Sequence, residues 1–162
     1  MSFEAHDKGV PYGKVELSES TELVQLMGGL TALKITNQPR SEFDWMNIAR
    51  NGIPKKAVME LAKKISFSLA EIATVLHLSE RSLHRYTSSS ILKTEYAEKT
   101  VELAKLYTRG EEVFGNMDTF KNWMRTPSFI LGGEAPINLL DNSLGFNIVL
   151  NELGKIEHGV LA

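Results

Sequence analysis

An all-α fold is predicted by three features of the 162-residue sequence. Apolar residues recur at intervals of three, four and seven, which places them on one side of a helix. No stretch alternates apolar and polar residues over the length of a strand, so no sheet is expected. Residues 69–86 fit two short helices joined by a tight turn, the pattern of a helix-turn-helix. The sequence therefore predicts a helix-turn-helix domain followed by a small helical domain.

Residues 1–49 are predicted to form an N-terminal arm followed by accessory helices. Glycine and proline interrupt the first 19 residues, which favours a flexible arm. A helix is expected over residues 20–27, and the segment LTALKIT after its two closing glycines is compatible with an extended conformation. Ser41 then begins a further helix as its N-cap.

Residues 50–93 are predicted to form the helix-turn-helix domain. The first helix of the motif places Ile72 and Leu76 on its inner face, and the second continues that face with Leu83 and Tyr86. A lysine-rich helix precedes the motif, with its apolar residues directed inward and its four lysines outward. We expect this preceding helix to pack on the motif.

Two local signals mark the ends of the first helix of the motif. Ser68 and Glu71 have the spacing of a capping box, which satisfies amide donors in the first turn. His77 occupies the turn position that usually holds glycine. A positive φ is uncommon for other residues, although histidine is among the enriched exceptions.

Charge is distributed unevenly along the chain. Residues 50–110 carry 11 basic and 6 acidic side chains, whereas residues 1–49 carry 4 and 7, and residues 111–162 carry 3 and 7. The basic excess coincides with the motif and suits a polyanion such as DNA. The alternative to a DNA-binding motif is an ordinary helical hairpin whose polar face is only solvated. The predicted DNA-contacting residues are Ser79, Glu80, Arg81, Ser82, His84 and Arg85 of the second helix, with Lys55, Lys56, Lys63 and Lys64 of the preceding one.

Residues 94–115 are predicted to form a long connecting or dimerisation helix. Tyr96, Leu103 and Tyr107 recur at heptad-like intervals along it. A helix of about 20 residues spans about 30 Å, enough to join two parts of a protein or two subunits. Gly110 and Gly115 are interpreted as its weak points.

Residues 116–162 are predicted to form the second helical domain. A short helix around Trp123 ends at Pro127, and a loop rich in glycine and proline follows. A last helix then carries Phe146, Val149 and Leu153 on one face.

Several classes of function are disfavoured by composition. The chain has no cysteine, and its four histidines are scattered without ligand spacing, so no metal site is expected. No catalytic set, phosphate loop or cofactor motif is present, which argues against an enzyme. No apolar run approaches the roughly 18 residues of a membrane span, and the N-terminus does not resemble a signal peptide. A cytoplasmic location is therefore expected.

The C-terminal third carries an ordered set of residues. Its sequence is a Trp-containing helix, then Arg125, Thr126 and Pro127, then Leu131, Gly132, Gly133, Pro136, Leu139, Leu140 and Gly145, and finally Ile156, Glu157, His158 and Gly159. In order and spacing this set resembles the toxin-binding domain of Xre/MbcA/ParS-type antitoxins. The helix-turn-helix and long helix before it are arranged as in that family, so the resemblance covers residues from about 50 to 162.

The resemblance implies a bacterial type II antitoxin that binds a cognate RES-domain toxin, an enzyme that consumes NAD. It also implies occlusion of the toxin's active site, repression of the antitoxin's own operator DNA, and a homodimer within a larger complex. A plain dimeric helix-turn-helix repressor with a C-terminal dimerisation or partner domain is the alternative. The toxin-binding residues carried over from the resemblance are Arg125, Leu131, Gly132, Glu157, His158, Gly159, Val160, Leu161 and Ala162.

Overall fold

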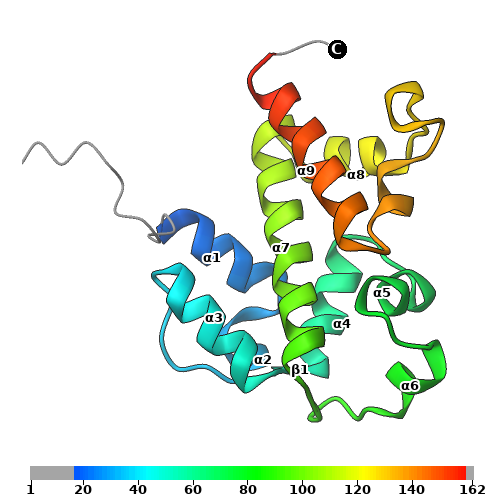
Figure 1. Ribbon diagram of the computed structural model, residues 1–162. Coiled ribbons are helices and arrows are strands. Elements are labelled where there is room, and N and C mark those ends of the chain that lie inside the picture. Colours follow the sequence, from blue (N-terminus) through cyan, green and yellow to red (C-terminus); the bar gives the residue numbers. More distant parts are fainter. Residues whose placement is uncertain (1–16, 160–162) are drawn as a thin grey trace, which may run out of the picture.

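The computed structural model describes residues 17–159, which are arranged around one long central helix (Figure 1). The all-α prediction is confirmed for this part of the chain. In order, the elements are α1 (Leu17–Leu26), α2 (Gly29–Leu33), α3 (Glu42–Asn51), β1 (Ile53–Pro54), α4 (Lys55–Lys64), α5 (Leu69–Leu76), α6 (Glu80–Arg85), β2 (Ile91–Leu92), α7 (Thr94–Phe114), α8 (Met117–Arg125), the 3-10 helices η1 (Phe129–Leu131) and η2 (Pro136–Leu139), and α9 (Ser143–Glu157).

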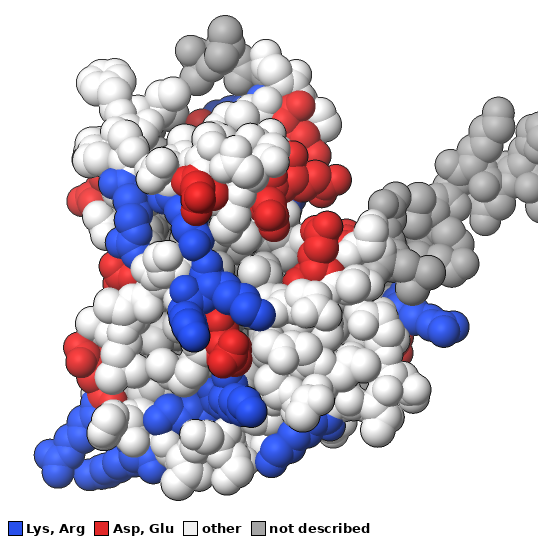
Figure 2. Space-filling model, turned by 180° about the vertical axis from the view of Figure 1, so that it is seen from behind, with Lys and Arg blue, Asp and Glu red and all other residues white. Residues whose placement is uncertain are grey.

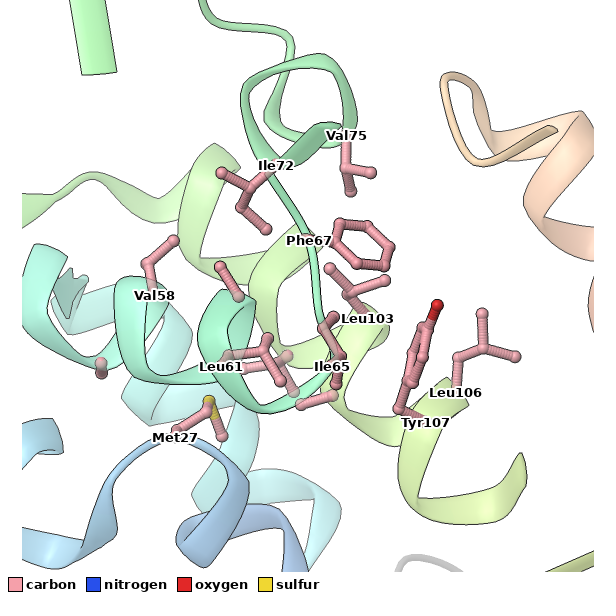
Figure 3. Packing of buried hydrophobic residues seen from close by; sticks show 14 of the residues in the cluster. Met27, Val58, Leu61, Ile65, Phe67, Ile72, Val75, Leu103, Leu106 and Tyr107 are labelled. Carbon is pink, nitrogen blue, oxygen red and sulfur yellow. The ribbon is translucent and has the colours of Figure 1, made fainter. Parts of the chain in front are cut away.

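Helix α7 connects the regions that the sequence divides. It packs against α1 and α3 on the N-terminal side, against α5 of the helix-turn-helix, and against α8 and α9 of the C-terminal region. Figure 3 shows Leu61, Ile72 and Tyr107 among the buried side chains of this shared core, which come from α4, α5 and α7. The predicted segments therefore share one hydrophobic core.

The prediction that α7 offers Leu103 and Tyr107 as a dimer surface is wrong. Both side chains are buried inside the protomer. The Tyr107 ring packs edge-on against Phe67 and against Phe120, with centroid separations of 5.6 and 5.0 Å. The helical period located the apolar face correctly, but that face is covered by the same chain.

The N-terminal helices belong to the core and are more than accessories. Leu23 and Met27 of α1 and Trp45 of α3 are buried. The segment LTALKIT is not extended as expected. Gly28 and Gly29, both with φ near 90°, turn the chain into the short helix α2 instead. The predicted flexible arm lies largely outside the described residues.

A short antiparallel ladder was not predicted. Ile53 pairs with Leu92 and Pro54 with Ile91, so β1 and β2 join the two ends of the helix-turn-helix region. Strands of two residues are too short to show an alternating period. The ladder and its neighbours fix the loop that follows α6, since the backbone amide of Lys55 donates to the Ser90 carbonyl at 2.8 Å.

The C-terminal region begins at the end of α7. Asn116 caps α8, and Asn142 caps α9 through a hydrogen bond from the Gly145 amide. Between these helices the chain forms the two 3-10 turns. Val149 and Leu153 of α9 are buried as predicted. No helix in residues 17–159 is long and apolar enough to cross a membrane.

Candidate functional site

The start of the helix-turn-helix is fixed by the predicted capping box. The Ser68 hydroxyl accepts a hydrogen bond from the Glu71 amide at 3.1 Å, and the Glu71 carboxylate accepts one from the Ser68 amide at 2.9 Å. Both bonds satisfy donors that the first helical turn would otherwise leave unpaired. The prediction for this helix start is confirmed.

The turn of the motif holds His77 in the left-handed conformation, with φ 56° and ψ 38°. Its ring contacts two groups outside the motif. Nε2 lies 2.5 Å from the Asp141 carbonyl oxygen, and Nδ1 lies 3.3 Å from the Lys99 ammonium. A neutral ring protonated on Nε2 satisfies both partners, since the carbonyl only accepts and the ammonium only donates. The histidine at this usual glycine position therefore has a role of its own, because its side chain links the turn to Asp141 in the C-terminal region.

The second helix of the motif is α6, and it is shorter than predicted. The helix ends at Arg85, and Tyr86 follows in an extended conformation. Ser79 caps it, because its hydroxyl accepts from the Ser82 amide at 3.0 Å and donates to the Ser82 hydroxyl at 2.8 Å. These two predicted DNA contacts therefore already serve the helix start.

Arg81 and Arg85 are the exposed arginines of α6. Within the part of the chain that the structure describes, neither guanidinium has a hydrogen bond or an ion pair. Glu80 and His84 are also exposed on this helix. An exposed, unpaired guanidinium can contact a phosphate or the edge of a guanine without first losing an internal partner. The geometry of α6 therefore suits a recognition helix.

The four predicted lysines of α4 divide into two kinds. Lys55 donates to the Tyr86 carbonyl oxygen at 2.6 Å, and Lys64 donates to that of Gln25. Lys56 and Lys63 are exposed and have no such partner among residues 17–159. They are seven positions apart, which puts both on the same side of the helix.

The cations of the molecule are grouped. Figure 2 shows lysine and arginine side chains in a band that descends the back of the molecule and spreads along its lower end, where Figure 1 places α6. Acidic side chains gather mainly towards the upper part of the same view. This separation within a chain of net charge −2 gives the helix-turn-helix a basic surface.

Lys34 is a candidate DNA contact that sequence reasoning missed. It is exposed, and its ammonium donates to the Ser89 carbonyl oxygen at 3.3 Å, in the loop after α6. The two residues are 55 positions apart. No local sequence signal relates such distant positions, so only the fold brings this lysine to the motif.

Most of the predicted toxin-contacting residues lie at the other end of the molecule. The end of α9 and the loop that contains Leu131 and Gly132 are both far from α6 in Figure 1. Arg109 holds the end of α9, because its guanidinium donates to the Glu157 carboxylate at 2.6 Å and lowers the pKa of that carboxyl. His158 and Gly159 follow and are exposed, and residues 160–162 lie outside the described residues.

Arg125 lies apart from that group, against the helix-turn-helix. Its guanidinium donates to both Glu71 carboxylate oxygens at 2.9 Å, and to the Ser66 carbonyl oxygen at 2.7 Å. Lys121, one turn earlier, donates to the Ser66 hydroxyl at 3.1 Å. A residue carried over as a toxin contact therefore joins α8 to the start of α5.

The Arg125 contacts predict a pH-dependent contribution to stability. The Arg125 guanidinium lowers the pKa of the Glu71 carboxyl. Because the pKa is lowered in the folded state, the contribution is complete above the ordinary glutamate value of about 4.3 and is lost as the pH falls through the folded-state value. Arg125→Ala is expected to lower the free energy of unfolding by about 1 kcal/mol at pH 7, because solvent screens this half-exposed pair.

Urea unfolding at pH 7 and at pH 3 measures this effect. The difference between wild type and Arg125→Ala should shrink at the lower pH. Lys105→Ala is the control, because it removes a surface ion pair with Glu42 and should cost less than about 0.5 kcal/mol. An equal loss for Arg125→Ala at both pH values would contradict the role given to Glu71.

Residues 17–159 contain no group of three His, Asp or Glu side chains placed to hold an ion. The arrangement instead offers two surfaces, a basic one on α4 and α6 and a partly apolar one at the opposite end. Such surfaces suit macromolecular partners.

Comparison with known proteins matches two consecutive segments of the chain to known domains. Residues 44–105 match the Antitoxin Xre-like helix-turn-helix domain, and residues 109–159 match the Antitoxin Xre/MbcA/ParS C-terminal toxin-binding domain. An Antitoxin Xre of Yersinia enterocolitica is 31% identical over 100 residues, which cover 60% of this chain and 67% of the relative.

Two further relatives align over longer stretches. An Antitoxin Xre of Photorhabdus laumondii is 26% identical over 117 residues, or 71% of this chain and 79% of the relative. A protein of Sphingobium sp. named Prs ADP-ribosylating antitoxin is 26% identical over 132 residues, which cover 75% of this chain and 83% of the relative.

Proposed function

The chain belongs to the Xre family of antitoxins, and from this we propose that it neutralises a cognate RES-domain toxin and represses its own operon. The observation that carries the proposal is the separation of two surfaces. The exposed arginines of α6 lie at one end of the molecule, and the end of α9 lies at the other (Figure 1). One protomer can therefore hold DNA and a toxin at the same time.

The toxin's chemistry is proposed to be consumption of NAD. The Sphingobium relative carries ADP-ribosylation in its name, and ADP-ribosyl groups are ordinarily transferred from NAD. Operator DNA and NAD are both found inside the bacterial cell, so we place the chain in the cytoplasm. In this proposal the chain inhibits the toxin and binds no cofactor itself.

A homodimer is part of the proposal. Two-fold operators require two recognition helices about 34 Å apart, and a single α6 reads only a few base pairs. Sedimentation at micromolar concentrations should therefore show a species of twice the protomer mass. A monomer at every concentration would contradict this part of the proposal.

The decisive experiment uses the purified product of the toxin gene that the proposal expects beside the gene of this chain. Loss of NAD is followed with and without the antitoxin, and binding to a DNA fragment of the operon's promoter is measured separately. Inhibition of NAD loss together with promoter binding supports the proposal. Promoter binding without inhibition would instead favour the alternative, a plain dimeric repressor.

Removal of residues 158–162 is expected to release toxin activity. Helix α9 ends at Glu157, and its buried residues Val149 and Leu153 lie well upstream, so the deletion should leave the fold intact. NAD loss in a mixture of toxin and truncated antitoxin measures the effect, with promoter binding as the control. Inhibition equal to that of the full chain would show that these residues are not the occluding segment.

A further inference from the structure

The loop of residues 128–134, here called the tip loop, is closed by its own backbone. The Ser128 amide donates to the Glu134 carbonyl oxygen at 3.0 Å, and the Gly133 amide donates to that of Ser128 at 2.9 Å. Gly132, with φ 69°, ends the 3-10 turn through a bond from its amide to the Phe129 carbonyl oxygen at 3.1 Å. These crossing bonds fix the loop in one conformation.

The closed tip loop presents two large apolar side chains to solvent. Phe129 is 98% exposed, and its neighbour Ile130 is 56% exposed. Scattered exposed apolar residues are ordinary on protein surfaces. An adjacent pair on a backbone-locked loop is different, because the fold buries almost none of Phe129 and less than half of Ile130. Figure 1 shows the segment between α8 and α9, which contains the tip loop, projecting from the helices at the upper right.

We propose that Phe129 and Ile130 form an apolar anchor that inserts into a hydrophobic pocket on the surface of the toxin. The inference rests on the proposed function. A preorganised aromatic side chain loses little conformational freedom when it binds, and such residues dominate the energetics of protein interfaces. The anchor contacts the toxin outside the segment proposed to occlude the active site.

Three observations select the toxin as the occupant. The tip loop lies inside residues 109–159, which match the toxin-binding domain. It lies at the end of the molecule away from α6 (Figure 1). Its flank carries the exposed Glu134, held by the Asn138 amide at 3.2 Å, which disfavours a DNA phosphate as neighbour.

Phe129→Ala tests the anchor in the full-length chain. Its dissociation constant for a catalytically inactive variant of the RES-domain toxin is measured by calorimetry. We expect at least a 30-fold increase, the size of a hot-spot loss, and a smaller increase for Ile130→Ala. The melting temperature and promoter binding should not change, since Phe129 lies outside the core. Phe43→Ala is the matched control, because Phe43 is 67% exposed on α3 and should leave toxin affinity within two-fold of wild type.

The possible results separate this inference from the proposed function. Wild-type affinity in both Phe129→Ala and Phe129→Asp would overturn the anchor and leave toxin binding in place. Failure of the wild-type chain to bind the toxin would overturn both. A change of oligomeric state in Phe129→Ala, without weaker toxin binding, would assign the tip loop to contact between copies and also overturn the inference.

Discussion

Replacement of Gly110 by alanine is expected to lower the free energy of unfolding by about 3 kcal/mol, at the upper end of what overpacking costs. Gly110 of α7 is buried and faces the ring of Phe120 on α8. A Cβ atom there would lie 2.2 Å from Cε1 of Phe120 and 2.3 Å from two further ring atoms. Such distances are far inside van der Waals contact, so either the ring or the helix must move.

The Phe120 ring is surrounded by other aromatic rings. It is fully buried, and its centroid lies 5.0 Å from that of Tyr107, 5.6 Å from that of Phe114 and 5.8 Å from that of Trp123. Interiors are close-packed, so displacing one ring displaces its neighbours. The strain would therefore spread through the contact between α7 and α8.

Gly154→Ala is the matched control for Gly110→Ala. Gly154 also lies within a helix, but an added Cβ would meet only the Arg109 guanidinium at 3.5 Å, an ordinary contact. Because alanine favours helix more than glycine does, this substitution should stabilise the chain by up to about 1 kcal/mol. Urea unfolding of both variants measures the contrast. An unchanged midpoint for Gly110→Ala would contradict the close packing of the two helices.

Gly110 illustrates what the sequence could not predict. It was interpreted as a weak point of a long helix, because glycine lowers helix propensity. The structure shows that its missing side chain makes room for Phe120, ten positions further along the chain. Propensity describes one helix in isolation, and the reason for this glycine lies in another helix.

Local signals at the first helix of the motif and at its turn were read correctly. The Ser68 and Glu71 capping box and the positive φ of His77 each depend on residues within four positions of one another. Long-range partners were not accessible. Glu71 and Arg125 are 54 positions apart, and His77 and Asp141 are 64 apart. Arg125 was assigned to the toxin from the family resemblance, which does not show that its guanidinium is hydrogen-bonded to Glu71 in the same chain.

The same distinction explains the interpretation of the long helix. Periodicity shows that one face of α7 is apolar, but it does not show whether the same chain or a second copy covers that face. Met27 of α1 and Trp45 of α3 are among the residues of the core that contains this face. They come from the segment predicted to be accessory. The two errors therefore have one cause: the sequence did not show that residues from the N-terminal segment cover the apolar face of α7.

The double variant Arg81→Ala with Arg85→Ala is expected to lose at least about 30-fold in affinity for the promoter, since each base contact contributes about 1 to 3 kcal/mol. Stability should not change, because both side chains are exposed and unpaired within residues 17–159. Neutralisation of the toxin should also persist, since α6 lies away from α9 and the tip loop (Figure 1). Arg50→Ala, an exposed arginine at the end of α3, is the control.

Salt dependence distinguishes the two roles that an arginine or lysine can have at this surface. Loss of a phosphate contact lowers the slope of log affinity against log salt by about 1 and weakens all sequences equally. Loss of a base contact instead relaxes the preference for one sequence. We expect the first behaviour for Lys56→Ala and Lys63→Ala on α4 and the second for the arginines of α6, since α6 is the helix that we propose to enter the major groove. Unchanged promoter affinity in the arginine double variant would show that α6 is not the recognition helix, and the basic surface would then need another partner.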